Sequence, residues 1–590
     1  MRCKITFLLI LFQVFIVHFL IADTHIPAGD VSGTWTIDGS PYIVDGYVIV
    51  PVDSTLMIES GVLIFFSTNN GLRVKGQLIS EGSENDSIVF NVQDTSNNTG
   101  IGFYHTDTTN QDSSIVSYSI FEHVGVHFDK SSNILFQKSR VSKCMDYGGV
   151  YFDEDSCPTL MDVTISNNNT YSYGGGIYCT DGSCPRLVNV NVIGNSASWG
   201  GGIACRFDSN PILENVTIMN NFSESGAGMF CAESSPVLNN VLIAENEGSG
   251  FCCTDGSSPV LDNVVISKNV NGIYSENSSL ALTNIVITGN DGDGGACFGS
   301  YDGTDTILMK NFEITGNINE DFNGGGVGVG GVTMIMVNGI IADNYAFDVG
   351  GIYAESAQLG LKNVTICDNT IDDWGNVGGI GLNYYCKLDM TNCILWNNEL
   401  NEIAYMGPGC AWNIDYSNIE DGISSGTGNI SINPLFADTL YHLSEESPCI
   451  DAGNPDTTYY DIEDPDNPGF ALYPAMGTLH NDMGAYGGHG KYIFDPPQSV
   501  DDPHNLQSIV IHNYPNPFTS STVIYYTLPQ NIREAQIEIY NIKGQKIKEL
   551  SVNNNQSSVV WNAEGLASGL YFCKLTADKK ETITKMVLMR

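Results

Sequence analysis

Acidic side chains recur along the chain at a spacing that could serve metal chemistry. Each of six stands just before a Ser-x-Pro turn, or a Ser-Ser-Leu variant of it, in successive sequence repeats. If the repeats stack, the carboxylates lie close together, and a divalent cation would relieve their repulsion. Alternatively, each carboxylate accepts backbone N–H groups of its own turn. We expect the turn role, because the spacing slips by a residue between repeats; the six are Asp155, Asp181, Asp208, Glu233, Asp255 and Glu276.

Two further groups of residues are candidate metal ligands. His123 and His127 could share a metal, but no third ligand stands at a telling spacing, so we expect a surface role. Four aspartates late in the chain could bind calcium, although Pro465 and Pro468 fit a plain acidic loop as well. These four are Asp461, Asp464, Asp466 and Asp482. We therefore assign no catalytic, cofactor-binding or metal-binding residue and no cofactor.

Two of the sixteen cysteines are expected to form a disulfide. Cys157 and Cys184 each precede Pro in a Ser-Cys-Pro turn and are 27 residues apart, which is also the local repeat length. Equivalent Cα atoms on neighbouring parallel strands are about 4.8 Å apart, within the disulfide range. Two free thiols filling the turn are the alternative. Four other cysteines alternate with apolar residues and predict a buried thiol column, namely Cys179, Cys205, Cys231 and Cys253.

A repeated phrase must position these residues. Its template is an apolar residue, a small polar residue two positions on, apolar residues three and five positions on, and Asn eight positions on. Twelve copies follow one another in steps of 21 to 29 residues. A unit of this length cannot bury its own apolar face, so the copies must stack. They begin at Ile115, Phe136, Leu160, Leu187, Leu213, Leu238, Leu261, Leu282, Met309, Met336, Leu361 and Met390.

Each repeat contains three short strand phrases, such as PRLV, VNVIG and GGIAC between Cys184 and Cys205. Each phrase alternates with period two, which is typical of a strand with one buried face. Three strands per coil predict an all-β fold, a parallel β-helix. Asn at the third and ninth template positions predicts left-handed turn conformations and stacked amide ladders.

The whole set resembles the right-handed parallel β-helix family, which includes pectate lyases and many bacterial surface proteins. The resemblance covers roughly Trp35 to Asn429 and implies the fold, not a chemistry. We therefore predict a right-handed parallel β-helix over residues 23–430, followed by a small C-terminal β-sandwich.

Residues 1–22 are predicted to be a secretory signal peptide. Arg2 and Lys4 precede an apolar run from Ile5 to Ile21, and Ala22 offers a small residue for cleavage. A retained membrane anchor is the alternative, because the run is near the minimum length that spans a bilayer. We expect no transmembrane segment in the mature chain.

The segment after the repeats has motifs of its own. Residues 431–490 contain NPLFADTLYHLSEESPCIDAGNP and NDMGAYGG, which resemble the choice-of-anchor Q region found after β-helices in anchored surface proteins. This sequence departs from the usual pattern at Gly487, where an acidic residue is expected. Residues 491–508 read as a linker, with the composition DPPQSVDDP.

Residues 509–590 form a small domain of different charge, with nine Lys or Arg against six Asp or Glu from Ile511 onward. Alternating strand runs with glycine-containing turns predict a β-sandwich. The phrases YPNPF, IYNIKG and GLYF and the basic end resemble the type A sorting domain of the type IX secretion system. This resemblance implies export across the outer membrane of a Gram-negative-type bacterium, removal of the domain, and attachment to the cell surface or release.

Composition restricts the partners. The net charge of −43 repels nucleic acid and polyanions. We predict a secreted or cell-surface protein that is structural, adhesive or carbohydrate-binding. Its expected partners are the type IX secretion machinery and an extracellular polysaccharide or a host or neighbouring cell surface.

A polysaccharide lyase or glycoside hydrolase is the alternative function. Lyases of this superfamily need a cationic base, yet only seven Lys or Arg lie between Val141 and Cys410, and Arg186 and Arg206 differ in phase. A hydrolase needs paired carboxylates facing one groove. Because no repeat is interrupted by a cleft-forming loop, we favour the non-enzymatic function.

Overall fold

The computed structural model describes two compact units, residues 1–497 and 498–590. Within them, it describes residues 23–489 and 510–588, except for 68–70, 96–98, 105–112, 132, 146–147, 293, 321–323, 515–520, 528–534, 542–544, 552–557, 564, 567–568 and 578–579. The predicted signal peptide and the whole of the predicted linker lie outside the described residues.

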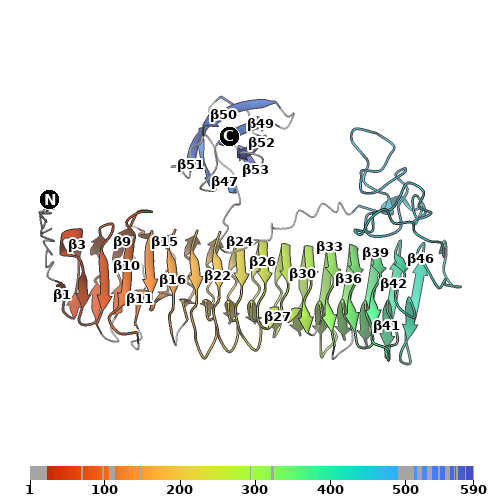
Figure 1. The fold of residues 1–590 in the computed structure, drawn as a ribbon, viewed down its shortest axis with the longest axis horizontal. Coiled ribbons are helices and arrows are strands. Elements are labelled where there is room, and N and C mark those ends of the chain that lie inside the picture. Colours follow the sequence, from red (N-terminus) through yellow and green to blue (C-terminus); the bar gives the residue numbers. More distant parts are fainter. Residues whose placement is uncertain are drawn as a thin grey trace, which may run out of the picture. The chain divides into compact units, whose positions relative to one another are not determined.

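The first unit is a solenoid of stacked coils whose strands pair in parallel from one coil to the next (Figure 1). One sheet of 16 strands takes a single strand from each coil, because each GGI-type phrase contributes one short strand. Its strands are β2 (Gly29–Asp30), β5 (Val48–Val50), β8 (Gly71–Val74), β11 (Thr99–Tyr104), β14 (Val124–Asp129), β17 (Val150–Asp153), β20 (Ile177–Cys179), β23 (Ile203–Arg206), β25 (Met229–Ala232), β27 (Ser249–Thr254), β29 (Asn271–Glu276), β32 (Ala296–Gly299), β35 (Val327–Gly330), β38 (Ile352–Glu355), β41 (Ile380–Asn383) and β44 (Ile403–Tyr405).

The opposite sheet has 26 strands and contains the other two strand phrases of each coil. In the central coils these two phrases join into one long strand, so the prediction of three separate strands per coil was wrong there. The strands are β1 (Thr24–Ile26), β3 (Gly33–Trp35), β4 (Tyr42–Val44), β6 (Thr55–Ile58), β7 (Leu63–Phe66), β9 (Gln77–Glu81), β10 (Ile88–Val92), β12 (Ser114–Ser117), β13 (Ser119–Glu122), β15 (Ile134–Gln137), β16 (Arg140–Ser142), β18 (Thr159–Met161), β19 (Thr164–Ser166), β21 (Arg186–Val188), β22 (Asn191–Ile193), β24 (Ile212–Met219), β26 (Val237–Ala244), β28 (Val260–Ser267), β30 (Leu280–Thr288), β33 (Thr306–Thr315), β36 (Thr333–Ala342), β39 (Gln358–Cys367), β42 (Lys387–Thr391), β43 (Ile394–Trp396), β45 (Ala411–Asp415) and β46 (Asn418–Ile419).

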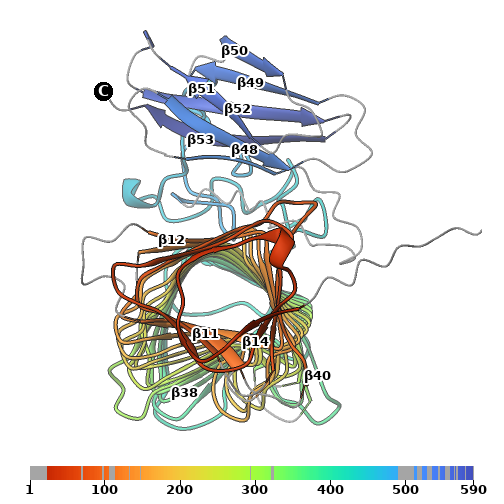
Figure 2. The same ribbon diagram turned by 90° about the vertical axis from the view of Figure 1, so that its left-hand side faces the viewer.

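A short third sheet lines one corner of the later coils, with strands β31 (Asp291–Gly292), β34 (Ile318–Asn319), β37 (Tyr345–Ala346) and β40 (Thr370–Ile371). Viewed along its axis, the solenoid superimposes coil upon coil around one interior (Figure 2). That interior is a continuous core of inward-facing apolar side chains. Like residues stack on like: the rings of Phe90 and Phe121 are 4.8 Å apart, and those of Phe103 and Phe128 are 5.3 Å apart.

Asn at the third template position bends each coil, as predicted. Asn189, Asn215 and Asn240 have φ of 53°, 55° and 55°, the left-handed region that Asn tolerates. The prediction was wrong for the ninth position, where the preceding residue has the positive φ instead. Asn220, with φ 54°, precedes the ninth-position Asn221 in this way.

The ninth-position asparagines form a buried ladder, which confirms the predicted amide stacking. Asn221 donates from its side-chain Nδ2 to Asn246 Oδ1 at 3.0 Å, and its backbone N–H donates to the same oxygen at 2.9 Å. The last member, Asn398, donates to the buried carboxylate of Glu402, which terminates the row. This inner asparagine ladder comprises Asn168, Asn195, Asn221, Asn246, Asn269, Asn290, Asn317, Asn344, Asn369 and Asn398.

Residues 431–488, the post-helix region, fold back onto the last coils of the solenoid. Two third-position asparagines of these coils donate to this region, Asn363 to Asp482 O at 2.9 Å and Asn338 to Ala485 O at 3.1 Å. An apolar cluster that includes Ile340 and Ile394 of the solenoid and Met483 of this region lies beneath the contact. The one turn of 3₁₀-helix in the region is Thr457–Tyr459, and a second such turn, Ile37–Gly39, lies in the first coils.

Cysteine positions agree with the predictions. Cys157 and Cys184 form a disulfide with their Cα atoms 4.6 Å apart. The predicted thiol column is also present, because its four members pair in register along β20, β23, β25 and β27 and are fully buried.

The second unit contains two antiparallel sheets. One has β47 (Val510–Tyr514), β48 (Ser521–Thr527) and β51 (Ser558–Asn562), and the other has β50 (Lys546–Ser551), β49 (Ala535–Asn541), β52 (Gly569–Ala577) and β53 (Lys580–Leu588). Ile524 and Trp561 of the first sheet share a buried cluster with Ile537 and Leu575 of the second. Among the described residues of both units, no helix is long and apolar enough to cross a membrane.

Candidate functional site

One row of side chains on the outer face of the 16-stranded sheet runs along the solenoid. Strand pairing places one residue of each coil in this row. From β8 to β41 the row comprises Arg73, Gly102, His127, Tyr151, Tyr178, Ala204, Phe230, Cys252, Tyr274, Cys297, Gly328, Tyr353 and Gly381. Because the strands of successive coils pair in parallel, equivalent positions of successive repeats lie side by side in this outer row.

In the first half of the outer row, aromatic rings pack on one another. The ring centroids of His127 and Tyr151 are 4.7 Å apart, and those of Tyr151 and Tyr178 are 5.3 Å apart. Desolvation within this stack lowers the pKa of His127. His127 therefore lies in an aromatic stack, while His123 occupies a turn with φ 59°.

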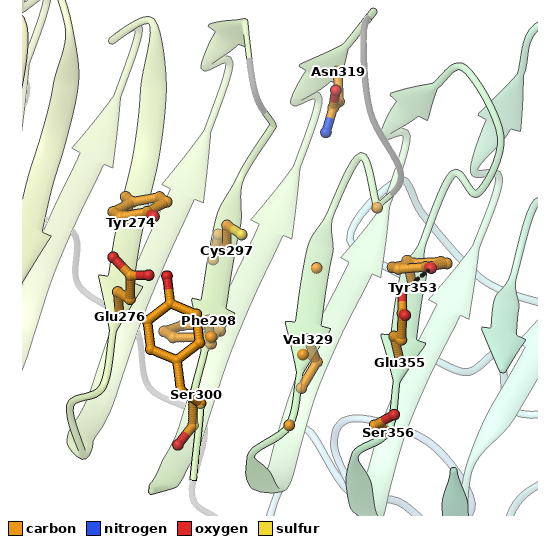
Figure 3. Close-up of a pocket in the computed structure, with 17 residues that line it drawn as sticks. Tyr274, Glu276, Cys297, Phe298, Ser300, Asn319, Val329, Tyr353, Glu355 and Ser356 are labelled. Atoms are coloured by element: carbon orange, nitrogen blue, oxygen red, sulfur yellow. Dashed lines mark hydrogen bonds between the residues drawn. The ribbon is translucent and has the colours of Figure 1, made fainter. Parts of the chain in front are cut away.

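The second half of the outer row is hollowed into a groove of about 680 Å³. Tyr274 and Glu276 of β29 form one wall, and Tyr353 and Glu355 of β38 form the other, with Val329 between them (Figure 3). The two strands between the walls carry small residues at the positions that pair with the wall residues, Cys297 and Gly299 on β32 and Gly328 and Gly330 on β35. We call this feature the tyrosine groove.

Hydrogen bonds hold the groove walls. The hydroxyl of Tyr353 donates to Glu355 Oε2 at 2.6 Å and accepts from Asn383 Nδ2 at 3.0 Å. On the other wall, burial and the nearby Glu276 carboxylate raise the pKa of Tyr274 to about 12. A side-chain hydrogen bond to Glu276 raises the pKa of the exposed Tyr301. The phenols of Tyr274 and Tyr301 therefore remain protonated at neutral pH, and a phenol can both donate and accept a hydrogen bond.

The charge of the groove comes from its carboxylates. Glu276 and Glu355 line it, and the lining contains no Lys or Arg among the residues that the structure describes. A uronate chain would meet like charge there without a cationic group to neutralise it.

The backbone positions of Glu276 and Glu355 are also well separated. They are in register three strands apart, which places their Cα atoms at about 14 Å from strand spacing alone. Retaining and inverting glycosidases hold their carboxyl groups about 5 to 9.5 Å apart.

Five of the six recurring acidic residues lie in turns, while the acceptance of backbone N–H groups by their carboxylates stays a prediction; Asp181 and Asp255 accept threonine hydroxyls, from Thr180 and Thr254. Asp155, Asp208 and Glu233 have φ of 60°, 58° and 52°, and Asp181 and Asp255 also adopt left-handed backbone. Glu276 differs, because Asn277 takes the left-handed position (φ 49°) and Glu276 remains in strand β29 as a groove wall. The one-residue difference in spacing between repeats, which argued against a shared metal site, thus places Glu276 in the groove.

The late aspartates divide into two pairs. The carboxylate of Asp461 accepts the backbone N–H of Asp482 at 3.2 Å, and that of Asp482 accepts the N–H groups of Asp451 and Met476 at 2.8 and 2.7 Å. Asp464 accepts the N–H of Asp466 in an exposed turn. In the described part of the chain, no three His, Cys, Asp or Glu side chains gather as metal ligands.

The two arginines considered for a lyase site are separate. Arg186 forms an ion pair with Glu214 at 2.7 Å, while Arg206 lies over the ring of Tyr173 at 4.3 Å. The groove residues Tyr353 and Glu355 were missed from the sequence; the available indication was the Tyr-x-Glu tripeptide, present in both β29 and β38.

Comparison with protein families agrees with this architecture. Residues 124–291 match the model for the right handed beta helix region, and residues 512–589 match that for the secretion system C-terminal sorting domain. The chain is a right-handed β-helix protein with a type IX sorting domain. That domain implies secretion or export to the cell surface and interaction with the type IX machinery. A comparison with curated protein sequences gives no match.

Proposed function

We propose that this β-helix protein is a non-enzymatic, surface-displayed carbohydrate-binding protein. The observation that carries the proposal is the tyrosine groove, which combines aromatic walls, hydroxyl groups and two carboxylates on an outer sheet face. Aromatic side chains offer an apolar face, and carboxylates accept the hydroxyl hydrogens of a sugar. The volume is within the range of about 300 to 1,000 Å³ typical of small-molecule sites.

The sorting domain supports binding outside the cell. We propose that the domain is removed after passage through the outer membrane of a Gram-negative-type bacterium, and that the β-helix remains at the surface or is released. The post-helix region, which resembles a choice-of-anchor Q region, would stay with the β-helix because it packs on the last coils.

Retention on insoluble polysaccharides tests this function. The protein released from cells is mixed with insoluble β-glucan, mannan and chitin, and unbound protein is measured after sedimentation. Saturable retention on at least one of them, without release of soluble sugar, is expected. Retention on none, or release of unsaturated or reducing sugar ends, contradicts a non-enzymatic carbohydrate-binding role.

A further inference from the structure

Two glycines keep the tyrosine groove open although the fold does not need them. A Cβ atom on Gly330 would meet no heavy atom within 4 Å, and one on Gly299 would meet only Ser275 O, at 3.9 Å. Neither residue has a positive φ. By contrast, a Cβ on Gly326 would meet Gly351 O at 2.8 Å, so that glycine is required by packing.

Gly299 and Gly330 are the last residues of β32 and β35, and glycine often stands where a ligand approaches the backbone closely. Gly330 and Gly299 occupy the row that carries Glu276 on one side and Glu355 on the other. Any larger side chain there would extend between the two carboxylates. Glycine at these two positions therefore keeps the space between the carboxylates empty.

We propose that this space receives an uncharged glycan chain, bound over the glycine floor between Tyr274 and Tyr353. The inference rests on the proposed function and names its ligand class and its site. Tyrosine and serine hydroxyls in the lining can both donate and accept, and sugar hydroxyls have the same dual capacity. The ammonium groups of a basic peptide could only donate to the lining, and a polyuronate would be repelled by both glutamates.

A larger side chain at Gly330 tests the site without changing the tyrosines and glutamates of the walls. In Gly330→Gln the new side chain occupies the groove. The matched control is Gly360→Gln, because Gly360 lies in β39 of the other sheet and its added Cβ would meet only Met334 O at 3.9 Å. Tyr353→Ala removes one wall. Circular dichroism and thermal unfolding establish that each variant is folded.

Binding is measured by calorimetry on the full chain, with neutral hexasaccharides of β-glucan and mannan, hexagalacturonate and hexalysine. We expect Gly330→Gln and Tyr353→Ala to weaken binding of a neutral hexasaccharide about tenfold or more, the size of a central interface contact. Gly360→Gln should bind like the unaltered chain.

Three results overturn the inference. Tightest binding of hexagalacturonate or hexalysine contradicts the ligand class. Equal binding of a neutral sugar by Gly330→Gln and the unaltered chain contradicts the site but leaves the proposed function standing. If neither the hexasaccharides nor the insoluble polysaccharides bind, the proposed function and this inference both fail.

Discussion

At the scale of single residues, the inner asparagine ladder turns a polar side chain into a core element. Asn246 is 2% exposed, and its Oδ1 accepts from both the backbone N–H and the Nδ2 of Asn221. Each amide thus satisfies its neighbour, which is the condition for burying polar groups at little cost.

Removal of one ladder residue should therefore cost more than its own hydrogen bonds. In Asn246→Ala, two donors of Asn221 lose their acceptor in the core, so we expect a loss of about 2 to 4 kcal/mol in unfolding free energy. The control Asn239→Ala lies exposed in the same coil and should change stability by less than about 0.5 kcal/mol. Chemical denaturation measures both; equal effects would show that the ladder does not contribute to stability.

The disulfide is a second feature of this scale. Peptide mapping without reduction should recover Cys157 linked to Cys184 in air-exposed protein. Because the bond closes a loop with a sequence separation of 27, the double serine variant should lose about 3 kcal/mol. Free, alkylatable thiols at both positions in native protein would refute the linkage.

At the scale of elements, stacking of like upon like was predictable, and several details were not. The Asn-containing template predicted the β-helical coil, the strand register and the asparagine ladder, because each repeat must bury the same face against the next repeat. Whether β24 is one strand or two depends on how closely the bend at Asn215 preserves pairing on both sides, which repeat spacing does not reveal.

The groove was not predictable for a similar reason. Its walls come from coils with unequal loops, so the alignment of Glu276 with Gly299, Gly330 and Glu355 becomes visible only when the strands are paired. Glu276 belonged by sequence to the turn acids, and a one-residue difference changed its role.

The docked post-helix region should respond to pH. Burial, with the neighbouring Asp482 and Asp451 carboxylates, raises the pKa of Asp461 to about 8, and burial raises that of Asp482 to about 7. Carboxyl groups with raised pKa in the folded state bind more protons when folded than when unfolded. Their stabilising contribution is therefore complete below the ordinary carboxyl pKa and is lost as pH rises toward 8.

We expect residues 431–488 to become more susceptible to limited proteolysis at pH 8.5 than at pH 6. The variant Asp461→Asn, which cannot ionise, should reduce this difference, whereas Asp464→Asn in the exposed turn should not. A region that is more protected at pH 8.5 would contradict the assignment.

At the scale of the whole molecule, the two units serve successive stages. The sorting domain implies export, and the β-helix presents its long sheets outside the cell. We expect the surface form to lack residues 1–22 and the segment after about Asn513. Intact mass of protein shaved from cells measures both ends; a surface form that still ends at Arg590 would contradict this processing.

Carbohydrate binding in the tyrosine groove is tested most directly by oxidative footprinting of tyrosines with and without a saturating neutral hexasaccharide. Tyr301, 84% exposed in the groove, and Tyr171, 82% exposed and outside the groove lining, form a matched pair. Binding in the groove predicts reduced labelling of Tyr274, Tyr301 and Tyr353 with Tyr171 unchanged. Unchanged labelling of the groove tyrosines at saturation, with or without protection of Tyr171, would contradict it.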